Sequence, residues 1–446
     1  MTQEQLKNLR LEDFQAPNKV LCYGAGLIGR MVVDSYRRLG IHIVGFIDKY
    51  KQGTVKTEFG ALPIYSIDTA VHTFGKELKV VITISNTKDF PEIVSSLTAA
   101  GVEKSCVVDW SFINWVTVPS AKCYCESLFG TTQLGSGSFI QCCYWGENRS
   151  FNVETLEPGT PPEQIAQNYV EKLRHYHKKA LEGEVPAYCA DCPHLEDRPV
   201  EKEIRLKNVY FSATAHCNAE CIYCSGILET DLKKLPYDAK GYGKLFFSTL
   251  RYLDDCGLLA PDVRIGYAGG EISVSPARKE LLDFALKHPQ YQHKFLSNCI
   301  VYNEGIAQAL AQNPKSELMC DLDAGTPESY LLMKGFNFFD KVVENLGRYA
   351  QNGRVILKYI VMPGFNTTRE DYLGMIKLLK KLGLTELLLS QDHLHTMDLY
   401  TERRSIFEVA RFKKLLAENG IEGVLFPDSF SIRQARLVER FYKQMP

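Results

Sequence analysis

The sequence carries almost no net charge, because 52 Lys and Arg residues balance 53 Asp and Glu residues to give −1 at pH 7. A basic surface for nucleic acid or a strongly charged surface for membrane lipids is therefore not expected. Long apolar runs are also missing, and none reaches the roughly 18 residues that a membrane-spanning helix needs. The first residues are polar and mixed in charge, so we expect a cytoplasmic protein.

Internal repeats of about 20 to 50 residues and low-complexity segments are absent as well, which excludes repeat architectures. A chain of 446 residues is too long for one ordinary hydrophobic core, so about two or three domains are expected. Cysteine, by contrast, is plentiful, with 14 residues. Because cytosolic thiols are kept reduced, metal or cluster ligation explains them better than disulfides do. Cys22 and Cys106 lie in apolar runs and are predicted to be packing residues.

The first part of the chain alternates strand and helix. An apolar run at 20–23 precedes Gly24-Ala25-Gly26-Leu27-Ile28-Gly29, a helix to about residue 39 and a second apolar run at 41–47. Further strands are expected at 80–84 and near 106–108, with a helical stretch after Pro91. We predict a small doubly wound, Rossmann-like α/β domain over residues 1–118.

Residues 119–200 have a different texture, with few long apolar runs and cysteines among Gly and Pro. One helix is clear, because Pro161-Pro162 opens it. Its apolar residues at helical spacing are Ile165, Tyr169, Leu173 and Tyr176. The cysteines of this segment are Cys123, Cys125, Cys142, Cys143, Cys189 and Cys192. We predict a separate cysteine-rich module here.

From residue 201 to residue 446, strands and helices alternate again. Helical segments between most of the strands indicate parallel strands with crossover helices, in a partial (β/α)6 barrel. Such a fold carries its chemistry at the carboxyl ends of the strands. The six predicted strands are 209–213, 263–267, 294–296, 318–322, 355–361 and 387–389.

Three cysteines with the spacing C-x3-C-x2-C follow the first of these strands: Cys217, Cys221 and Cys224. A 4Fe-4S cluster has four irons that prefer thiolate, so three ligands leave one iron open, and chemistry can occur there. The alternative is a structural zinc site completed by His216. The position at the mouth of a barrel strand disfavours it.

This motif resembles that of the radical S-adenosylmethionine (SAM) superfamily, and the resemblance covers about residues 207–390. It includes the spacing and an aromatic residue, Tyr223, before the last cysteine. The resemblance implies that SAM chelates the open iron and is cleaved reductively to a 5'-deoxyadenosyl radical, the cofactor carrying the reaction. It also implies an electron donor such as flavodoxin or ferredoxin.

Gly269-Gly270-Glu271 ends the second predicted strand and is similar to a turn with which the superfamily holds the amino group of SAM. The glycines let backbone approach a ligand closely, and a carboxylate suits an ammonium group. Ile272 follows the glutamate here, whereas proline is commoner in the superfamily. We do not expect this difference to endanger SAM binding.

Polar residues at later strand ends complete the predicted site. Ser297 and Asn298 look like ribose-side positions of the superfamily, and Asp323 looks like a substrate-side position; capping and turn formation are the alternative roles. Lys358 would face either the barrel or solvent by strand alternation. We name Asp323 and Lys358 as candidate catalytic residues, although Lys358 could equally be a snorkelling structural lysine.

The middle cysteines Cys142, Cys143, Cys189 and Cys192 resemble auxiliary cluster modules of the SPASM or twitch kind, which usually follow the barrel instead. Four thiolates can fill a second 4Fe-4S cluster that relays electrons or, with one site open, anchors a substrate. A zinc knuckle built on the C-x2-C pair is the alternative. Cys123 and Cys125 are spare candidates.

The glycine loop Gly24, Gly26 and Gly29 stands between a strand and a helix, and Asp48 ends the next strand about 20 residues on, as dinucleotide recognition requires. Over about the first 115 residues the chain also resembles nucleotide-binding domains attached to sugar-modifying proteins. That resemblance implies a bound nucleotide or nucleotide-sugar. The alternative is a Rossmann-like scaffold used only for docking.

Together these patterns predict a radical SAM enzyme with parts 1–118, 119–200 and 201–446. The preferred substrate is a sugar or nucleotide-linked small molecule. A peptide-modifying maturase is the alternative within the class. A non-catalytic iron–sulfur regulator that binds SAM or a nucleotide is the alternative outside it.

Overall fold

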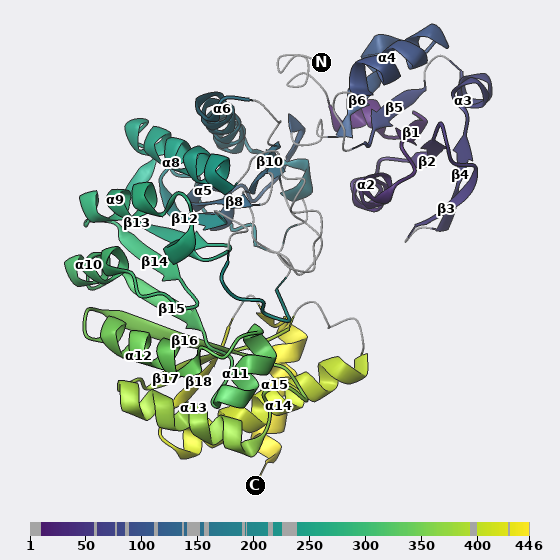
Figure 1. Ribbon diagram of the computed structural model, residues 1–446. Coiled ribbons are helices and arrows are strands. Elements are labelled where there is room, and N and C mark those ends of the chain that lie inside the picture. Colours follow the sequence, from purple (N-terminus) through teal and green to yellow (C-terminus); the bar gives the residue numbers. More distant parts are fainter. Residues whose placement is uncertain are drawn as a thin grey trace. The chain divides into compact units, whose positions relative to one another are not determined.

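The computed structural model forms two compact units (Figure 1). Unit 1 combines Met1–Cys125 with Lys172–Lys202, and unit 2 combines Glu126–Glu171 with Glu203–Pro446. The predicted boundaries at residues 118 and 200 stay predictions. The structure describes residues 10–57, 60–75, 78–84, 89–110, 115–135, 138–140, 152–155, 160–189, 192, 194–212, 217–224, 239–392, 399–426 and 429–445.

Unit 1 contains a six-stranded sheet in the order β3-β4-β2-β1-β5-β6. Its neighbouring strands pair in parallel except β3 with β4. The order turns back at β1, where a doubly wound sheet places its ligands. The strands are β1 (Val20–Tyr23), β2 (Ile43–Ile47), β3 (Gly53–Thr57), β4 (Gly60–Tyr65), β5 (Lys79–Ile82) and β6 (Val107–Asp109).

Helices cover both faces of this sheet, so unit 1 has three layers. Cys22 of β1 packs in the cluster that includes α2, and its neighbour Leu21 packs on the other face with α3 and α4. Cys22 is fully buried and Cys106 is 6% exposed, which confirms that both are packing residues. The helices are α2 (Leu27–Arg38), α3 (Ile67–Phe74) and α4 (Phe90–Ala99).

The middle segment contributes a long helix, α6 (Pro162–Leu181), which begins at the predicted proline pair. Its four predicted apolar residues are all at most 1% exposed: Ile165, Tyr169, Leu173 and Tyr176. On either side of this helix in the sequence, β7 (Thr117–Pro119) and β11 (Glu184–Pro186) pair antiparallel. A short 3-10 helix, η6 (Ala187–Cys189), follows β11.

Unit 2 is built on a ten-stranded sheet in the order β10-β9-β8-β12-β13-β14-β15-β16-β17-β18. The ladders from β8 to β18 are parallel, while β9 and β10 run antiparallel at one end. The six predicted strands correspond to β12–β17, and β8 and β18 extend the parallel set. The strands are β8 (Thr131–Gly135), β9 (Ser138–Ile140), β10 (Asn152–Thr155), β12 (Leu206–Ser212), β13 (Leu259–Ala268), β14 (Gln292–Leu296), β15 (Glu317–Asp321), β16 (Arg354–Val361), β17 (Glu386–Gln391) and β18 (Glu422–Leu425).

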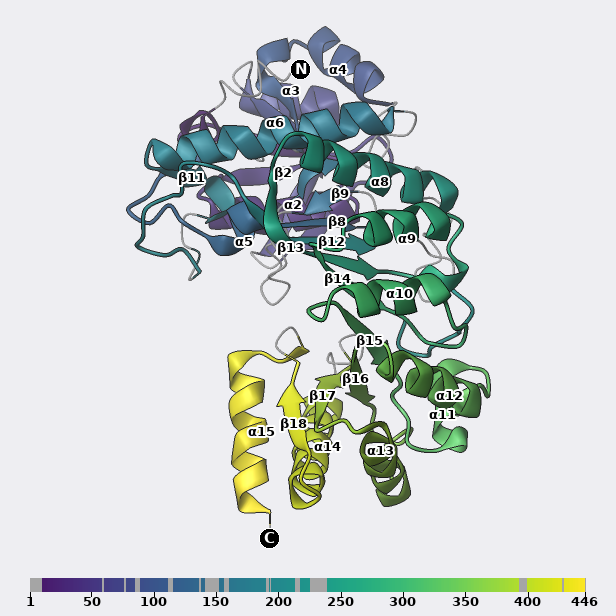
Figure 2. The same cartoon turned by 90° about the vertical axis from the view of Figure 1, so that its left-hand side faces the viewer.

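From β12 onward the strands lie side by side in chain order, so right-handed crossovers place the connecting helices on one face. Figure 2 shows α8, α9 and α10 along that face. The carboxyl ends of the strands consequently share one edge. The helices are α5 (Glu126–Gly130), α8 (Ala239–Asp255), α9 (Arg278–Lys287), α10 (Glu304–Gln312), α11 (Pro327–Lys334), α12 (Phe339–Ala350), α13 (Arg369–Leu382), α14 (Leu399–Glu418) and α15 (Ile432–Gln444), with the 3-10 helix η8 (Ile272–Val274) after β13.

None of the described helices is both long and apolar enough to cross a membrane.

Candidate functional site

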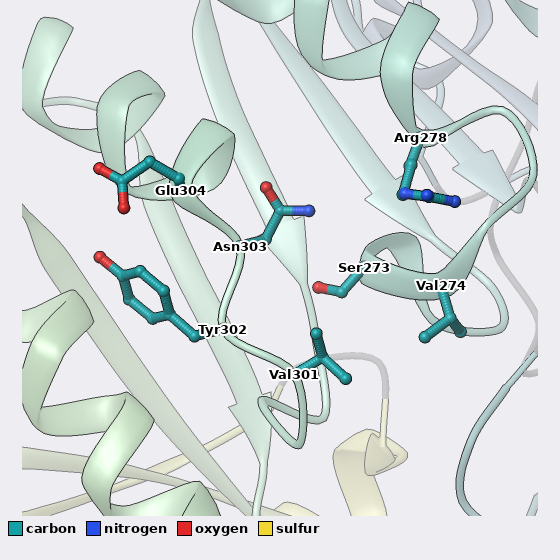
Figure 3. A pocket seen from close by; sticks show the side chains of 7 residues that line it. All are labelled: Ser273, Val274, Arg278, Val301, Tyr302, Asn303 and Glu304. Atoms are coloured by element: carbon teal, nitrogen blue, oxygen red, sulfur yellow. The ribbon is translucent and has the colours of Figure 1, made fainter.

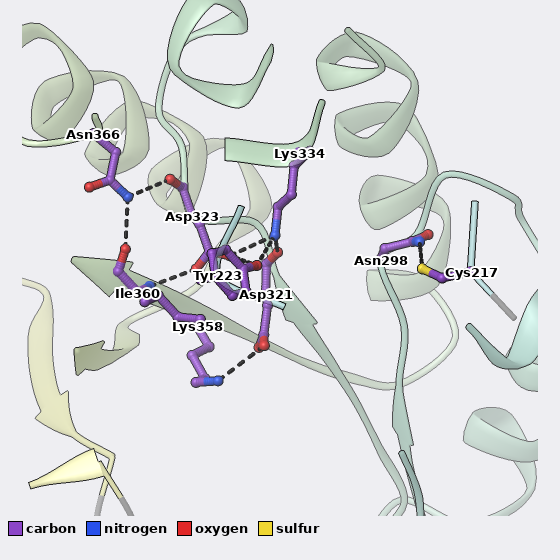
Figure 4. Close-up of polar contacts among 9 residues, drawn as sticks. All are labelled: Cys217, Tyr223, Asn298, Asp321, Asp323, Lys334, Lys358, Ile360 and Asn366. Atoms are coloured by element: carbon purple, nitrogen blue, oxygen red, sulfur yellow. Dashed lines mark hydrogen bonds and ion pairs between the residues drawn. The ribbon is translucent and has the colours of Figure 1, made fainter. Parts of the chain in front are cut away.

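The predicted site residues of unit 2 follow four consecutive parallel strands and gather at one edge of the sheet. The cysteine loop, residues 217–224, comes after β12, and the Gly-Gly-Glu turn comes after β13. Asn298 follows β14 and Asp323 follows β15. Figure 4 shows Asn298 reaching Cys217 and Tyr223 reaching Asp323. The loops after β14 and β15 therefore both contact the cysteine loop.

The cysteine loop is held by backbone bonds to the end of α11. The amide of Glu220 donates to the carbonyl of Lys334 at 3.0 Å, and the amide of Ile222 donates to that of Met333 at 3.1 Å. Gly335 lies against the same loop, because a Cβ added there would lie 2.9 Å from the Cβ of Glu220. The loop therefore has a defined position against a helix that lies more than a hundred residues later in the chain.

The three thiols of this loop lie close enough to influence one another. Partial burial raises the pKa of Cys217, and the nearby Cys224 raises it further. Burial also raises the pKa of Cys221, whereas Lys334 opposes that shift. Three neighbouring thiols are the donors that cluster iron prefers, so the set fits three corners of a 4Fe-4S cluster. Within the described residues, no group of three His, Cys, Asp or Glu side chains is arranged to hold a single metal ion.

Tyr223 anchors the loop to a buried ion pair. Its hydroxyl donates to Oδ2 of Asp323 and accepts from Nζ of Lys334. Lys334 and Asp323 themselves pair at 2.6 Å, with side chains only 2% and 0% exposed. Burial alone would lower the pKa of Lys334, but Asp323 and Cys221 raise it above its usual value, so the lysine is a cation.

Lys358, the second predicted catalytic residue, is also ion-paired. Its Nζ lies 3.0 Å from Oδ2 of Asp321, and its side chain is 12% exposed. The ammonium also lies 5.1 Å from the ring centroid of Phe426. Both predicted catalytic side chains are thus engaged within the protein, and their catalytic roles stay predictions.

Glu271 is fully buried, and its carboxylate binds protein donors. Oε1 accepts from the amide of Ser273 at 2.9 Å and the hydroxyl of Ser297 at 3.0 Å, and Oε2 accepts from the amide of Asn298 at 2.7 Å. Burial raises its pKa despite these bonds. Gly269 and Gly270 form the turn with φ of 75° and 60°, which favours glycine. Glu271 therefore fastens this turn to the end of β14.

Asn298 continues the connection from Glu271 to the cysteine loop. Its side-chain Nδ2 donates to Oδ1 of Asn218 at 2.7 Å and lies 3.6 Å from Sγ of Cys217. Its Oδ1 accepts from the amide of Ile300 at 3.0 Å. The Gly-Gly-Glu turn, the end of β14 and the cysteine loop are thus linked by consecutive hydrogen bonds.

A pocket of about 520 Å³ opens beside these loops, between η8 and the segment that leads into α10. Figure 3 shows its lining side chains, with Arg278 on one side of the view and Tyr302 and Glu304 on the other. The lining residues are Ser273, Val274, Arg278, Val301, Tyr302, Asn303 and Glu304. Ser273 follows Glu271 by two positions, so the pocket adjoins the predicted SAM-binding turn.

The middle cysteines are described only in part. Cys142 and Cys143 lie outside the described residues. The amide of Cys192 donates to the carbonyl of Cys189 at 3.0 Å, and both cysteines are partly exposed. Cys125 is buried and Cys123 is partly exposed. The second cluster stays a prediction.

In the glycine loop of unit 1, the backbone requires glycine at two positions, whereas the third position has free space for a side chain. Gly24 has φ of 109°, and a Cβ at Gly29 would lie 2.0 Å from the carbonyl oxygen of Gly24. Apart from its two chain neighbours, a Cβ at Gly26 would meet no atom of the described residues within 4 Å. Gly24 and Gly29 therefore build the turn, while Gly26 leaves space at its surface.

Asp48 is turned toward this glycine loop. Its Oδ2 accepts from the amide of Ala25 at 2.9 Å, and its Oδ1 accepts from the amides of Tyr50 and Lys51 at 2.9 and 3.0 Å. Burial acts to raise its pKa, but these three amides prevail and lower it. The carboxylate predicted to take part in dinucleotide recognition thus stabilises the loop, and nucleotide binding stays a prediction.

Residues 19–97 match the family model of the PglD N-terminal domain. Comparison with curated protein sequences gave no match. This matched segment contains the glycine loop and Asp48, but it covers much less than half of the chain.

Solved structures resemble parts of this chain at low identity. SuiB of Streptococcus suis bound to the precursor peptide SuiA is 11% identical, with 61% of this chain and 56% of that chain covered and a TM-score of 0.40. A radical SAM methyltransferase from Sphaerobacter thermophilus is 15% identical, covering 48% and 64%, with a TM-score of 0.35. Methylornithine synthase (PylB) is 13% identical, covering 49% and 70%, with a TM-score of 0.32. The match spans little more than half of SuiB, and TM-scores in this range do not establish a shared fold.

Lys334 is a central residue of this site that the sequence did not indicate. In the sequence it looks like an ordinary basic residue in the last turn of a helix, followed by Gly335 as the C-cap. Its partner Tyr223 lies 111 positions away, and no local pattern encodes that contact.

Proposed function

We propose that this chain is a radical SAM enzyme with a 4Fe-4S cluster on Cys217, Cys221 and Cys224. The observation that carries the proposal is the meeting of the cysteine loop with Asn298 and Asp323, from the ends of β14 and β15. A C-x3-C-x2-C loop at the carboxyl end of a parallel strand, backed by such contacts, suits a reactive cluster better than a structural zinc site.

When bound, the cluster would supply the electron that cleaves SAM to methionine and a 5'-deoxyadenosyl radical, which takes a hydrogen atom from the substrate. The chain's residues would hold three of the irons through thiolates and leave one iron open. Gly269 and Gly270 have left-handed backbone, which favours glycine, and they carry no side chains. The backbone polar groups of this turn can therefore approach an ammonium group. Glu271 would orient the turn, and Ser297 and Asn298 would lie on the ribose side.

For the substrate we propose a sugar or nucleotide-linked small molecule. Support comes from the glycine loop of unit 1, where a Cβ added to Gly26 would meet nothing within 4 Å in the described part of the chain beyond its two neighbours. A bound nucleotide could approach the backbone there, at the point where the sheet order turns back. A peptide substrate is the second candidate, favoured by the partly exposed Cys189 and Cys192, which suit an auxiliary cluster.

The first prediction concerns SAM cleavage. Protein reconstituted with iron and sulfide without oxygen should release 5'-deoxyadenosine when given SAM and dithionite, as measured by chromatography. Changing Cys217, Cys221 or Cys224 to Ala should abolish the release, because each thiolate holds one corner of the cluster.

Cys256→Ala is the matched control, since Cys256 is partly exposed but precedes β13, at the opposite end of the strands. It should retain full release. Full activity in any of the three loop variants would show that these residues do not bind the cluster. Wild-type protein that binds SAM and holds iron but never releases 5'-deoxyadenosine would instead support a regulator.

A further inference from the structure

Lys334 is buried in a way that satisfies every hydrogen of its ammonium group. Nζ donates to the hydroxyl of Tyr223, to the backbone carbonyl of Asp321 and to Oδ2 of Asp323. A lysine has three N–H donors, so none is left over. A buried cation with complete coordination by the protein is held at one point, because moving it would break several bonds at once.

Asp323, its counter-ion, is fixed just as firmly. Its Oδ1 accepts from the amide of Ile360 at 2.6 Å, and its carbonyl accepts from the side-chain amide of Asn366 at 2.8 Å. Its backbone has φ of 56°, the left-handed region that residues other than glycine seldom adopt. These bonds hold the carboxylate at the ends of β15 and β16 (Figure 4).

This ion pair contacts the cysteine loop through Tyr223. The Tyr223 ring packs with Ile222 against an apolar cluster of Met333, Ile360 and Met362. The ammonium of Lys334 lies 5.0 Å from the centroid of that ring. The end of α11 thus fixes the cysteine loop in two ways. The Lys334 side chain binds Tyr223, and the backbone carbonyls of Met333 and Lys334 accept amides of the loop.

We propose that Lys334 is a positioning residue that fixes the cysteine loop and places a permanent positive charge beside Tyr223 in that loop, tuning the reduction potential of the cluster. The charge effect rests on the proposed function, whereas the fixing of the loop does not. A nearby cation favours the more negative, reduced cluster, and a nearby anion disfavours it.

The test is a pair of opposite charge changes, read by a potentiometric titration of the cluster in the full-length protein. Lys334→Met should shift the midpoint potential to a more negative value, and Asp323→Asn should shift it to a less negative value. The double variant should return close to the wild-type potential. A lysine that only supports the loop would not give shifts of opposite sign.

Removing one member of a buried pair can destabilise the fold, so two further variants keep the test decisive. The double variant leaves no unpaired charge. Tyr223→Phe keeps the ring and both charges but removes the hydroxyl, so it should lose iron faster to a chelator while its potential changes little. Lys294→Met is the matched control, because Lys294 pairs with Glu317 at 3.1 Å near the opposite end of the strands.

Labelling of thiols in the metal-free protein separates this proposal from the proposed function. Cys217, Cys221 and Cys224 should react faster with a maleimide in Lys334→Met and Tyr223→Phe than in wild type or Lys294→Met. If wild-type protein holds no cluster, the proposed function fails, while this labelling still decides whether Lys334 fixes the loop. Unchanged labelling, or potential shifts of the same sign in both single variants, would overturn the proposal.

Discussion

Among single residues, Glu271 shows how a carboxylate predicted to meet a ligand also serves the protein's own loops. Glu271→Gln should weaken SAM binding more than substrate binding, measured by calorimetry. It should also lower the Tm, because the amide nitrogen of Gln would replace a carboxylate oxygen that accepts hydrogen bonds. That nitrogen is itself a donor and would face an N–H or O–H donor of the protein. Loss of a bond to a charged acceptor corresponds to about 1.5–3 kcal/mol.

Glu304→Gln is the control for this change, because Glu304 is an exposed carboxylate in the adjoining pocket. It should leave both the Tm and the SAM affinity near wild type. If Glu271→Gln loses stability but keeps its SAM affinity, the residue only supports the turn.

The sequence indicated residue types and positions at this scale, but it did not indicate their partners. Cys217 was predicted from the spacing of the three cysteines. Glu271, Asn298 and Asp323 were predicted from a family resemblance and from their positions after predicted strands. The pairing of Tyr223 with Lys334 depends on how α11 packs, and nothing in the local sequence contains that information. Asp48 was placed correctly at the end of β2, but its bond to the amide of Ala25 became apparent only in three dimensions.

At the scale of whole elements, the loop between β1 and α2 contains a tightly packed glycine, Gly29, and an open one, Gly26. Gly29→Ala should lower the Tm of the protein, because the new methyl group would lie 2.0 Å from a backbone oxygen. Overpacking of this kind costs about 1–3 kcal/mol or more. Gly26→Ala should cost about 1 kcal/mol or less, because that position is open and only caps a helix.

Ligand binding to the same loop follows from the open position. Gly26→Val should weaken binding of a nucleoside diphosphate sugar, measured by calorimetry, and should leave uncoupled SAM cleavage unchanged. If the wild-type chain binds no such ligand, the loop is a scaffold and the sugar proposal loses its main support.

Elements were easier to predict than contacts because their signals are local. The helix α6 follows from a proline pair and four apolar residues at helical spacing, and all four are buried. Strands β12–β17 follow from apolar runs between helical segments. Strand β8, by contrast, was not predicted, because its pairing with β12 joins residues 77 positions apart, for example Thr131 with Asn208.

At the scale of the whole molecule, the prediction of two clusters can be tested by counting iron. The reconstituted chain should hold about eight irons, and the variant with Cys217, Cys221 and Cys224 all changed to Ala should keep about four together with its brown colour. A colourless triple variant containing about one zinc would make the middle cysteines a structural zinc site. Electrons would then have to reach the loop cluster directly.

The order in which the two units use the chain constrains how the protein can be made and divided. Unit 1 needs β11, which pairs with β7, yet residues 126–171 between these strands belong to unit 2. A ribosome therefore releases part of unit 2, including β8–β10, before unit 1 has all of its strands. Since the chain passes between the units three times, a single proteolytic cut cannot liberate either one. Recombination could not transfer either unit as one continuous gene segment.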